Sequence, residues 1–173
     1  FTEDRLKLKG SLSYPMNCDL KDRLHHLCRS GKHASLDEFS QLDVCMGRLF
    51  ADAVAQLLNH CGVNAAQITA IGSHGQTVYH NPEGNTPTSI QIGDPNIIAE
   101  RTGITTVADF RRRDIAAGGQ GAPLVPAFHQ AIFQHPEEQR AIVNIGGIAN
   151  VTLLPGKPDM PVRGFDTGPG NTL

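Results

Sequence analysis

The residue types best suited to chemistry occur near the end of the sequence, in Gly164-Phe165-Asp166-Thr167-Gly168-Pro169-Gly170-Asn171. An aspartate that follows an apolar run and precedes small or rigid residues is typical of a strand end, where the backbone turns sharply and can approach a ligand closely. Asp166 is therefore the first candidate for a catalytic carboxylate. The alternative is a turn in which Asp166 caps the backbone and the glycines supply positive φ angles. The segment alone favours neither interpretation.

Three segments upstream repeat this arrangement, an apolar strand followed by polar or glycine-rich residues. They are residues 68–77, 89–95 and 104–114. In open α/β sheets, ligands bind outside the carboxyl ends of the strands, because the strand ends and the following loops form a crevice there. His74 could contact such a ligand, but on the residues alone a structural role is the stronger interpretation. Asp94 is better explained as the N-cap of a helix that begins at Pro95.

Arginines and glycines provide two further candidates. The triplet Arg111-Arg112-Arg113 stands between two aspartates and precedes the flexible loop Gly118–Pro123. Guanidinium groups hold carboxylate or phosphate bidentately, although an arginine triplet flanked by aspartates is ordinarily an ion-paired surface. The pair Gly146-Gly147 joins two apolar strands within residues 141–154, which indicates a hairpin. A glycine pair at this place would also permit close approach to a phosphate chain.

The helices and strands that would position these residues follow from the apolar periodicity. Ser35 and Glu38 have the spacing of a capping box, and an apolar stripe then runs to about Cys61, where Gly62 ends the helix. Three other helices are predicted. The first covers residues 19–29 and ends at Ser30-Gly31, and the second covers residues 95–101 and ends at Gly103. The third is a buried helix over residues 124–133. The predicted strands cover residues 6–13, 68–71, 89–92 and 104–108, the hairpin 141–154 and the run into Asp166. This order predicts an α/β layered domain with a mixed sheet.

The composition narrows the class of protein. The 173 residues are 39% hydrophobic and carry a net charge of −2, which fits one globular domain without the basic stripe of a nucleic-acid-binding protein. No apolar run reaches the ~18 residues that a membrane span needs. The four cysteines, Cys18, Cys28, Cys45 and Cys61, are too far apart for a zinc knuckle or a redox pair, so we expect a reducing, cytoplasmic compartment. The sequence contains no P-loop, no GxGxxG fingerprint and no GxSxG elbow.

As a set, six motifs resemble those of the anhydro-N-acetylmuramic acid kinases, in the same order and over the sequence from about Leu12 to its end. They are residues 71–77, 91–94, 109–114, 118–126, 144–150 and 165–171. The resemblance implies an actin-like (ribonuclease H-like) ATPase domain of the hexokinase, heat-shock-70 and actin superfamily. It also implies a bacterial, cytoplasmic enzyme of peptidoglycan recycling. Such an enzyme uses ATP and Mg²⁺ to convert 1,6-anhydro-N-acetylmuramic acid and water into N-acetylmuramic acid 6-phosphate.

The resemblance also implies roles for individual residues. Asp166 would be the general base that takes a proton from the water attacking the anomeric carbon. The amino sugar would contact His74, Arg112, Gly119, Gln120, Gly121, Ala122 and Pro123, with Arg112 chosen from its triplet to meet the lactyl carboxylate. ATP would contact Gly146, Gly147, Gly168 and Asn171. No protein side chain is assigned to a metal, and the expected assembly is a homodimer.

The sequence also departs from the family pattern. The first strand and the phosphate loop of the family are not found before Phe1, and its second domain is not found after Leu173. Residues 1–173 are therefore expected to be part of the amino-terminal actin-like domain, with residues 164–173 beginning the connection to the second domain. Such a piece is expected to be inactive alone and to self-associate through exposed apolar surface. The alternatives are another sugar kinase of the same superfamily and a non-catalytic sugar-binding module.

Overall fold

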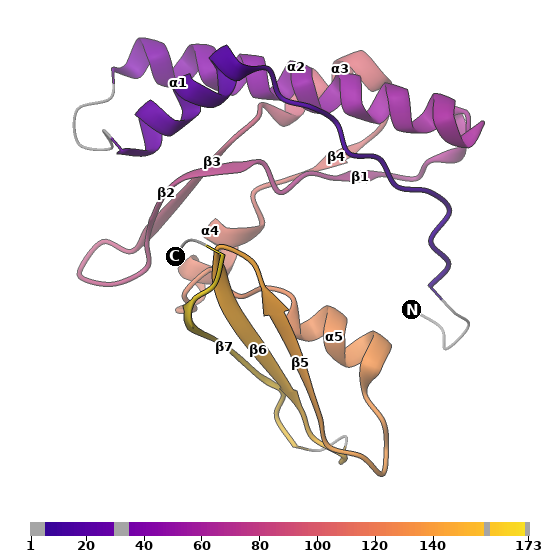
Figure 1. Ribbon diagram of the computed structural model, residues 1–173, viewed down its shortest axis with the longest axis vertical. Coiled ribbons are helices and arrows are strands. Elements are labelled where there is room, and N and C mark those ends of the chain that lie inside the picture. The colour runs from indigo at the N-terminus through magenta and orange to yellow at the C-terminus, as the bar shows by residue number, and fades with distance from the viewer. Residues whose placement is uncertain (1–5, 30–34, 158–159, 172–173) are drawn as a thin grey trace. The chain divides into compact units, whose positions relative to one another are not determined.

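The computed structural model describes residues 6–29, 35–157 and 160–171, and it divides the chain into two compact units (Figure 1). The amino-terminal unit spans Leu8–Ala117. The carboxy-terminal unit consists of Gly118–Leu173 together with the residues before Leu8. Helices and strands occur in both units, so the predicted α/β class is confirmed. The assignment of the whole chain to a single actin-like domain stays a prediction.

Two helices dominate the amino-terminal unit, α1 (Cys18–Arg29) and α2 (Leu36–Cys61), and both were predicted. The α2 helix begins as its sequence predicts, because Ser35 Oγ accepts a hydrogen bond from the Glu38 amide at 3.0 Å. It ends at Gly62, whose φ of 63° is left-handed. The Glu38 carboxylate accepts a hydrogen bond from Arg23 Nε at 2.9 Å, which ties α1 to α2. The predicted helix stop at Ser30-Gly31 lies outside the described residues.

The core of this unit forms between α1, α2 and strand β3 (Thr88–Ile92). Its apolar side chains recur at helical spacing on the two helices, so both helices turn one face toward the strand. The buried members are Leu20, Leu24, Leu27, Leu42, Met46 and Ile92. The apolar stripe of α2 is therefore core, as its periodicity indicated.

The remaining elements of this unit are short. Strands β1 (Ile71–Gly72) and β4 (Thr106–Val107) pair in parallel, and β2 (Gln76–Asn81) pairs with β3 in antiparallel fashion. A single 3-10 turn, η1 (Ala65–Gln67), precedes β1. Helix α3 (Pro95–Thr102) has Asp94 as its N-cap, as predicted, and ends at Gly103. Helix α4 (Phe110–Ala116) carries the arginine triplet and was not predicted, because the polar residues around it suggested a loop.

Three strand predictions for this unit were wrong in extent. Residues 6–13 form no strand, and Leu6 and Leu8 are 65% and 78% exposed, so their alternation has no partner to pack against. The strands predicted over 68–71 and 104–108 shrink to the two-residue strands β1 and β4. The described strands also form three separate small sheets and not one mixed sheet, since parallel and antiparallel pairs occur in different sheets.

Helix α2 lies unusually close to the loop between β3 and α3. Asp43 Oδ1 accepts a hydrogen bond from the Gly93 amide at 2.7 Å, and the Asp94 amide donates to the Asp43 carbonyl at 3.2 Å. A Cβ atom at Gly47 would lie 2.9 Å from the Asp94 carbonyl oxygen, so only glycine fits at this point of the helix. These contacts fix the loop that carries Asp94.

The carboxy-terminal unit is a three-stranded antiparallel sheet with one helix. The strands are β5 (Arg140–Ile145), β6 (Ile148–Leu154) and β7 (Arg163–Pro169), in the order β5-β6-β7. The predicted hairpin is confirmed. Helix α5 (Pro126–Phe133) packs on β6, where His129 Nδ1 and Thr152 Oγ1 are 2.8 Å apart. The predicted helix over 124–133 is shorter and not buried, because no residue of α5 is buried and Phe133 is 39% exposed.

The strand register gives this sheet two different faces. Thr152 and its register partner Gly164 lie on the face toward α5, because Thr152 bonds to His129 and a Cβ atom at Gly164 would collide with Pro126. The opposite face carries apolar side chains that are largely exposed, Val143 at 62% and Phe165 at 48%. Alternation along the strands therefore decides which side chains share the face with α5.

Candidate active site

Asp166 lies inside β7, not at a strand end as predicted, and it is not a turn cap. Its register partner is Asn150 of β6. The pairing then skips one residue, because Ala149 pairs with Gly168, so Thr167 forms a bulge in β7. Gly168 has a φ of 142°, which lets the strand continue beyond the bulge. Asp166 is exposed on the face toward α5 and stands directly before this bulge.

Asp166 belongs to a row of polar side chains that crosses the sheet. Asn144 of β5 pairs with Asn150, and Asn150 pairs with Asp166, so the three residues share one face. Side chains opposite each other on neighbouring antiparallel strands have Cβ atoms about 5 Å apart. The Asn150 Oδ1 atom is buried and has no hydrogen-bond partner among the described residues. We call Asn144, Asn150 and Asp166 the polar row.

The four residues predicted to contact ATP come together at one end of this sheet. The chain after β7 folds onto the turn between β5 and β6, since the Gly170 amide donates to the Gly147 carbonyl at 2.8 Å and the Asn171 amide to the Gly146 carbonyl at 2.7 Å. A Cβ atom at Gly170 would collide with the Gly146 carbonyl oxygen. A Cβ atom at Gly168 would meet no atom within 4 Å, so this side of the backbone is open. The end of the sheet therefore leaves room for a phosphate to approach the backbone.

The segment predicted to line the sugar pocket leads into α5 along the same face of the sheet. Pro123 Cγ would lie 3.4 Å from a Cβ atom at Gly164, the glycine two residues before Asp166. The Ala122–Pro123 peptide bond is cis, and Gly121 is buried with a φ of 71°. Gly119 and Gln120 precede it, and Gln120 is exposed. The structure thus brings Pro123 to the face that carries Asp166.

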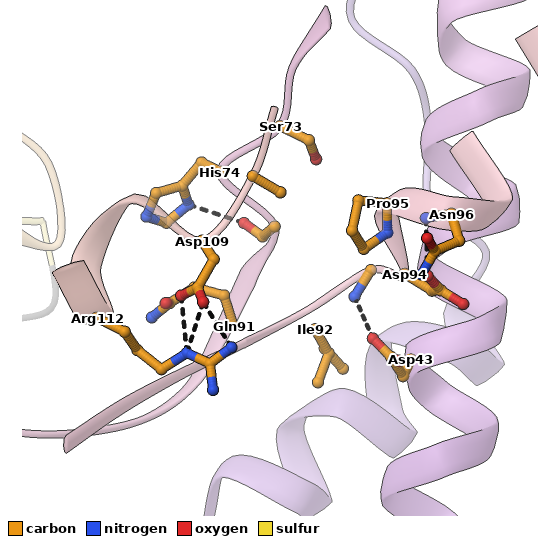
Figure 2. Close-up of a pocket in the computed structure, with 13 residues that line it drawn as sticks. Asp43, Ser73, His74, Gln91, Ile92, Asp94, Pro95, Asn96, Asp109 and Arg112 are labelled. Atoms are coloured by element: carbon orange, nitrogen blue, oxygen red, sulfur yellow. Dashed lines mark hydrogen bonds and ion pairs between the residues drawn. The ribbon is translucent and has the colours of Figure 1, made fainter. Parts of the chain in front are cut away.

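The other two predicted residues, His74 and Arg112, lie in the amino-terminal unit, where they line a hollow of about 380 Å³ (Figure 2). The Arg112 Nε donates to both carboxylate oxygens of Asp109 at 2.8 Å. This hydrogen bond raises the pKa of the Arg112 guanidinium above its ordinary value. The Arg112 side chain is nevertheless 66% exposed, so part of the guanidinium faces solvent.

His74 is held at both ring nitrogens. Arg111 Nε donates to His74 Nε2 at 2.9 Å, so Nε2 is the acceptor, and Nδ1 then carries the proton that it shares with the Gly75 carbonyl at 2.8 Å. This tautomer follows from the hydrogen-bond network. Both ring nitrogens of His74 are therefore engaged at the wall of the hollow.

Three carboxylates contribute to the lining of the hollow. Asp43, Asp94 and Asp109 all line it, and the one arginine among the lining residues is Arg112 (Figure 2). One carboxylate oxygen of Asp43 accepts a hydrogen bond from the Gly93 backbone amide, and one of Asp94 accepts from the Asn96 backbone amide. An excess of acceptors suits a ligand that brings many hydroxyl donors, because each carboxylate oxygen can accept more than one hydrogen bond. The hollow therefore fits a polyhydroxylated ligand better than a simple anion.

Comparison with known families shows which family the chain belongs to. The family model described as anhydro-N-acetylmuramic acid kinase matches residues 1–173. The chain belongs to this kinase family. The match extends over both units, including the polar row, the hollow and the turn Gly146-Gly147 between β5 and β6, which we call the glycine turn. No helix in the described part of the chain is long and apolar enough to cross a membrane.

Two features of the site were missed from the sequence. The polar row depends on the register of β6 against β5 and β7, which the sequence does not give. The only sign of it in the sequence is that Asn144 and Asn150 are polar residues in an otherwise apolar hairpin. The second missed feature is Asp43, which reaches the hollow because α2 approaches the Gly93–Asp94 loop. In the sequence, nothing distinguishes Asp43 from the other polar residues of the predicted helix. Helical spacing predicts which face is buried and not which loop the helix contacts.

The docking of Gly170 on the glycine turn gives a structural prediction. In Gly170→Ala the new Cβ atom would collide with the Gly146 carbonyl oxygen, so the last turn should detach and the amides of residues 170 and 171 should exchange hydrogen at least about tenfold faster. Gly146→Ala is the matched control, because its Cβ atom would meet nothing closer than the Ile148 carbonyl oxygen at 3.6 Å. Amide hydrogen exchange measures both, and unchanged protection in Gly170→Ala would contradict the contact.

Proposed function

We propose that the protein is an ATP-dependent kinase that opens the 1,6-anhydro ring of anhydro-N-acetylmuramic acid with water and phosphorylates O6. The products are N-acetylmuramic acid 6-phosphate and ADP, and the physiological setting is the recycling of cell-wall sugars in the bacterial cytoplasm. The observation that carries this proposal is the exposed Asp166 residue on a paired strand, directly before the bulge and two residues from the open backbone at Gly168. Family membership supports the kinase class.

The proposed reaction assigns Asp166 the role of general base. The Asp166 carboxylate accepts a proton from water as the water oxygen bonds to the anomeric carbon and the bond from that carbon to O6 breaks. O6 then bonds to the γ-phosphorus, the bond from the γ-phosphorus to the β-phosphate oxygen breaks, and ADP leaves. The proton on Asp166 passes to solvent, which the exposed position of the side chain permits. A carboxylate on a strand suits this role because its backbone is fixed by both the β6 pairing and the bulge.

The glycine turn suits the phosphate chain of ATP. Phosphoryl transfer depends mainly on positioning and charge neutralisation. Gly146, Gly147, Gly168 and Asn171 would hold the phosphates through backbone N–H groups and the side-chain carboxamide of Asn171, with open backbone at Gly168. In the described part of the chain, no three His, Cys, Asp or Glu side chains gather as metal ligands. Mg²⁺ commonly binds through substrate phosphates with few protein ligands, and it would neutralise phosphate charge during the transfer.

We assign the hollow of the amino-terminal unit to the amino sugar. Its carboxylates accept hydrogen bonds from sugar hydroxyls, and the exposed side of Arg112 offers donors to the lactyl carboxylate. Gly119, Gln120, Gly121, Ala122 and Pro123 are assigned to the same ligand. A homodimer is part of the proposal, and the exposed apolar side chains Val143 and Ile145, at 62% and 64%, are consistent with it. No nucleic-acid partner is proposed.

Asp166→Asn tests the base directly in the complete kinase. The variant keeps the shape of the side chain but cannot accept a proton, so kcat should fall by about 10² to 10⁴-fold while ATP binding is retained. Glu137→Gln is the matched control, since it neutralises an exposed carboxylate in the connection between α5 and β5 of the same unit and should leave kcat unchanged. Steady-state turnover and nucleotide-binding calorimetry measure the two quantities. Normal turnover in Asp166→Asn would remove the assigned role.

Arg112→Gln tests the assignment of the hollow. Loss of one charge-assisted hydrogen bond should raise KM for the amino sugar by roughly 10- to 100-fold, with KM for ATP unchanged. Arg113→Gln is the matched control because it removes the same charge from the same helix, at a residue that does not line the hollow. If both variants change KM equally, the effect comes from helix charge and not from a contact with the sugar.

A further inference from the structure

The polar row contains a side chain whose hydrogen-bonding capacity is not used. Asn150 is half-buried between two partners of the row, and its Oδ1 atom is sealed from solvent with no partner among the described residues. Its Nδ2 atom makes no hydrogen bond with the described residues either, but it is not sealed. A buried polar atom without a partner is destabilising and is rare in folded proteins, so its presence needs an explanation.

The position of Asn150 relative to Asp166 provides that explanation. The two residues are register partners on adjacent antiparallel strands and share a face, so their Cβ atoms are about 5 Å apart. A carboxamide nitrogen reaches an aspartate oxygen across such a pair. Because Oδ1 is the sealed end of the carboxamide, the donor end is the one that remains available.

The two side chains also differ in burial. Asp166 is exposed, and no hydrogen bond to its side chain is found among the described residues. Asn150 is enclosed on the central strand β6, with neighbours on both sides. A half-buried donor opposite an exposed carboxylate is an arrangement that can orient a general base.

We propose that Asn150 is the positioning residue of Asp166. When the substrates bind and displace water from the Asp166 side of the sheet, Asn150 Nδ2 donates a hydrogen bond to one carboxylate oxygen. The other oxygen is then directed at the water that it deprotonates. This inference rests on the proposed role of Asp166 as general base, and it concerns a residue that does not itself exchange a proton with the substrate.

Within the described part of the carboxy-terminal unit, few other charged side chains lie on this face of the sheet. Among the described residues of the carboxy-terminal unit, His129 of α5 bonds to Thr152, and Arg140 of β5 lies at the far end of the face, paired with Glu138 at 2.7 Å. Arg163 of β7 lies on the opposite face, because it alternates with Gly164 and Asp166. Within this unit, Asn150 is therefore the polar side chain placed directly opposite Asp166.

The test is the pH dependence of kcat in the complete kinase. Donation to a carboxylate favours its charged form and lowers its pKa, so Asn150→Leu should shift the acid limb of the kcat profile to higher pH and lower kcat by about 10- to 100-fold, with both KM values unchanged. Asn150→Ala removes the carboxamide donor without adding a charge or a larger side chain, so it should shift the limb in the same direction. It also carries the test if Asn150→Leu does not fold.

Asn144→Leu is the matched control. It removes the same side chain from the same row, but one strand further from Asp166, and should leave the acid limb in place. If the parent kinase turns over and the Asn150 variants keep its acid limb, Asn150 has no positioning role and the proposed function stands. A lowered kcat with an unshifted limb also overturns the inference, since it indicates a structural role. If the parent kinase does not turn over the anhydro sugar, the proposed function itself fails.

Discussion

The register of β7 on β6 is the constraint on which the candidate site depends. Side chains alternate between the two faces of a strand, so a slip of one residue would replace Asp166 by Phe165 on the face toward α5. The register is fixed from both ends. Gly164 accommodates Pro126 on one side of Asp166, and the bulge at Thr167 with Gly168 follows on the other. Thr167 Oγ1 adds a hydrogen bond to the Ala149 carbonyl at 3.1 Å. Glycines around Asp166 therefore set its orientation, while the carboxylate supplies the chemistry.

The amino-terminal unit uses a similar device for its hollow. The backbone of the Gly93–Asp94 loop is held against α2 by Asp43, and Gly47 removes the side chain that would keep them apart. Asp109 has a left-handed φ of 60° at the start of α4, and its carboxylate holds Arg112. Left-handed backbone is uncommon outside glycine, and aspartate is among the residues that tolerate it best. In both units, close backbone approach and not a large apolar core determines where the functional side chains stand.

Features that depend on local sequence could be predicted, and features that depend on pairing could not. The α2 helix, its Ser35 and Gly62 caps, and the Asp94 cap of α3 follow from side-chain periodicity and capping chemistry over a few residues. The glycine pair predicted the hairpin, but not that Asn144 and Asn150 would face each other. Gly-Pro-Gly after Asp166 suggested a strand end, whereas pairing with β6 extends β7 to Pro169. The family resemblance placed Asp166 at the centre of the site but gave no role to Asn150, whose sealed oxygen is visible only in three dimensions.

The most direct measurement is a crystal structure of the complete kinase with the anhydro sugar and a non-hydrolysable ATP analogue, at a resolution that shows ordered water. The account predicts a water molecule beside the anomeric carbon, with an Asp166 carboxylate oxygen about 2.6–3.2 Å from it. An Asp166 side chain on the opposite face of the sheet from the sugar, or a water held by a different carboxylate, would contradict the central claim.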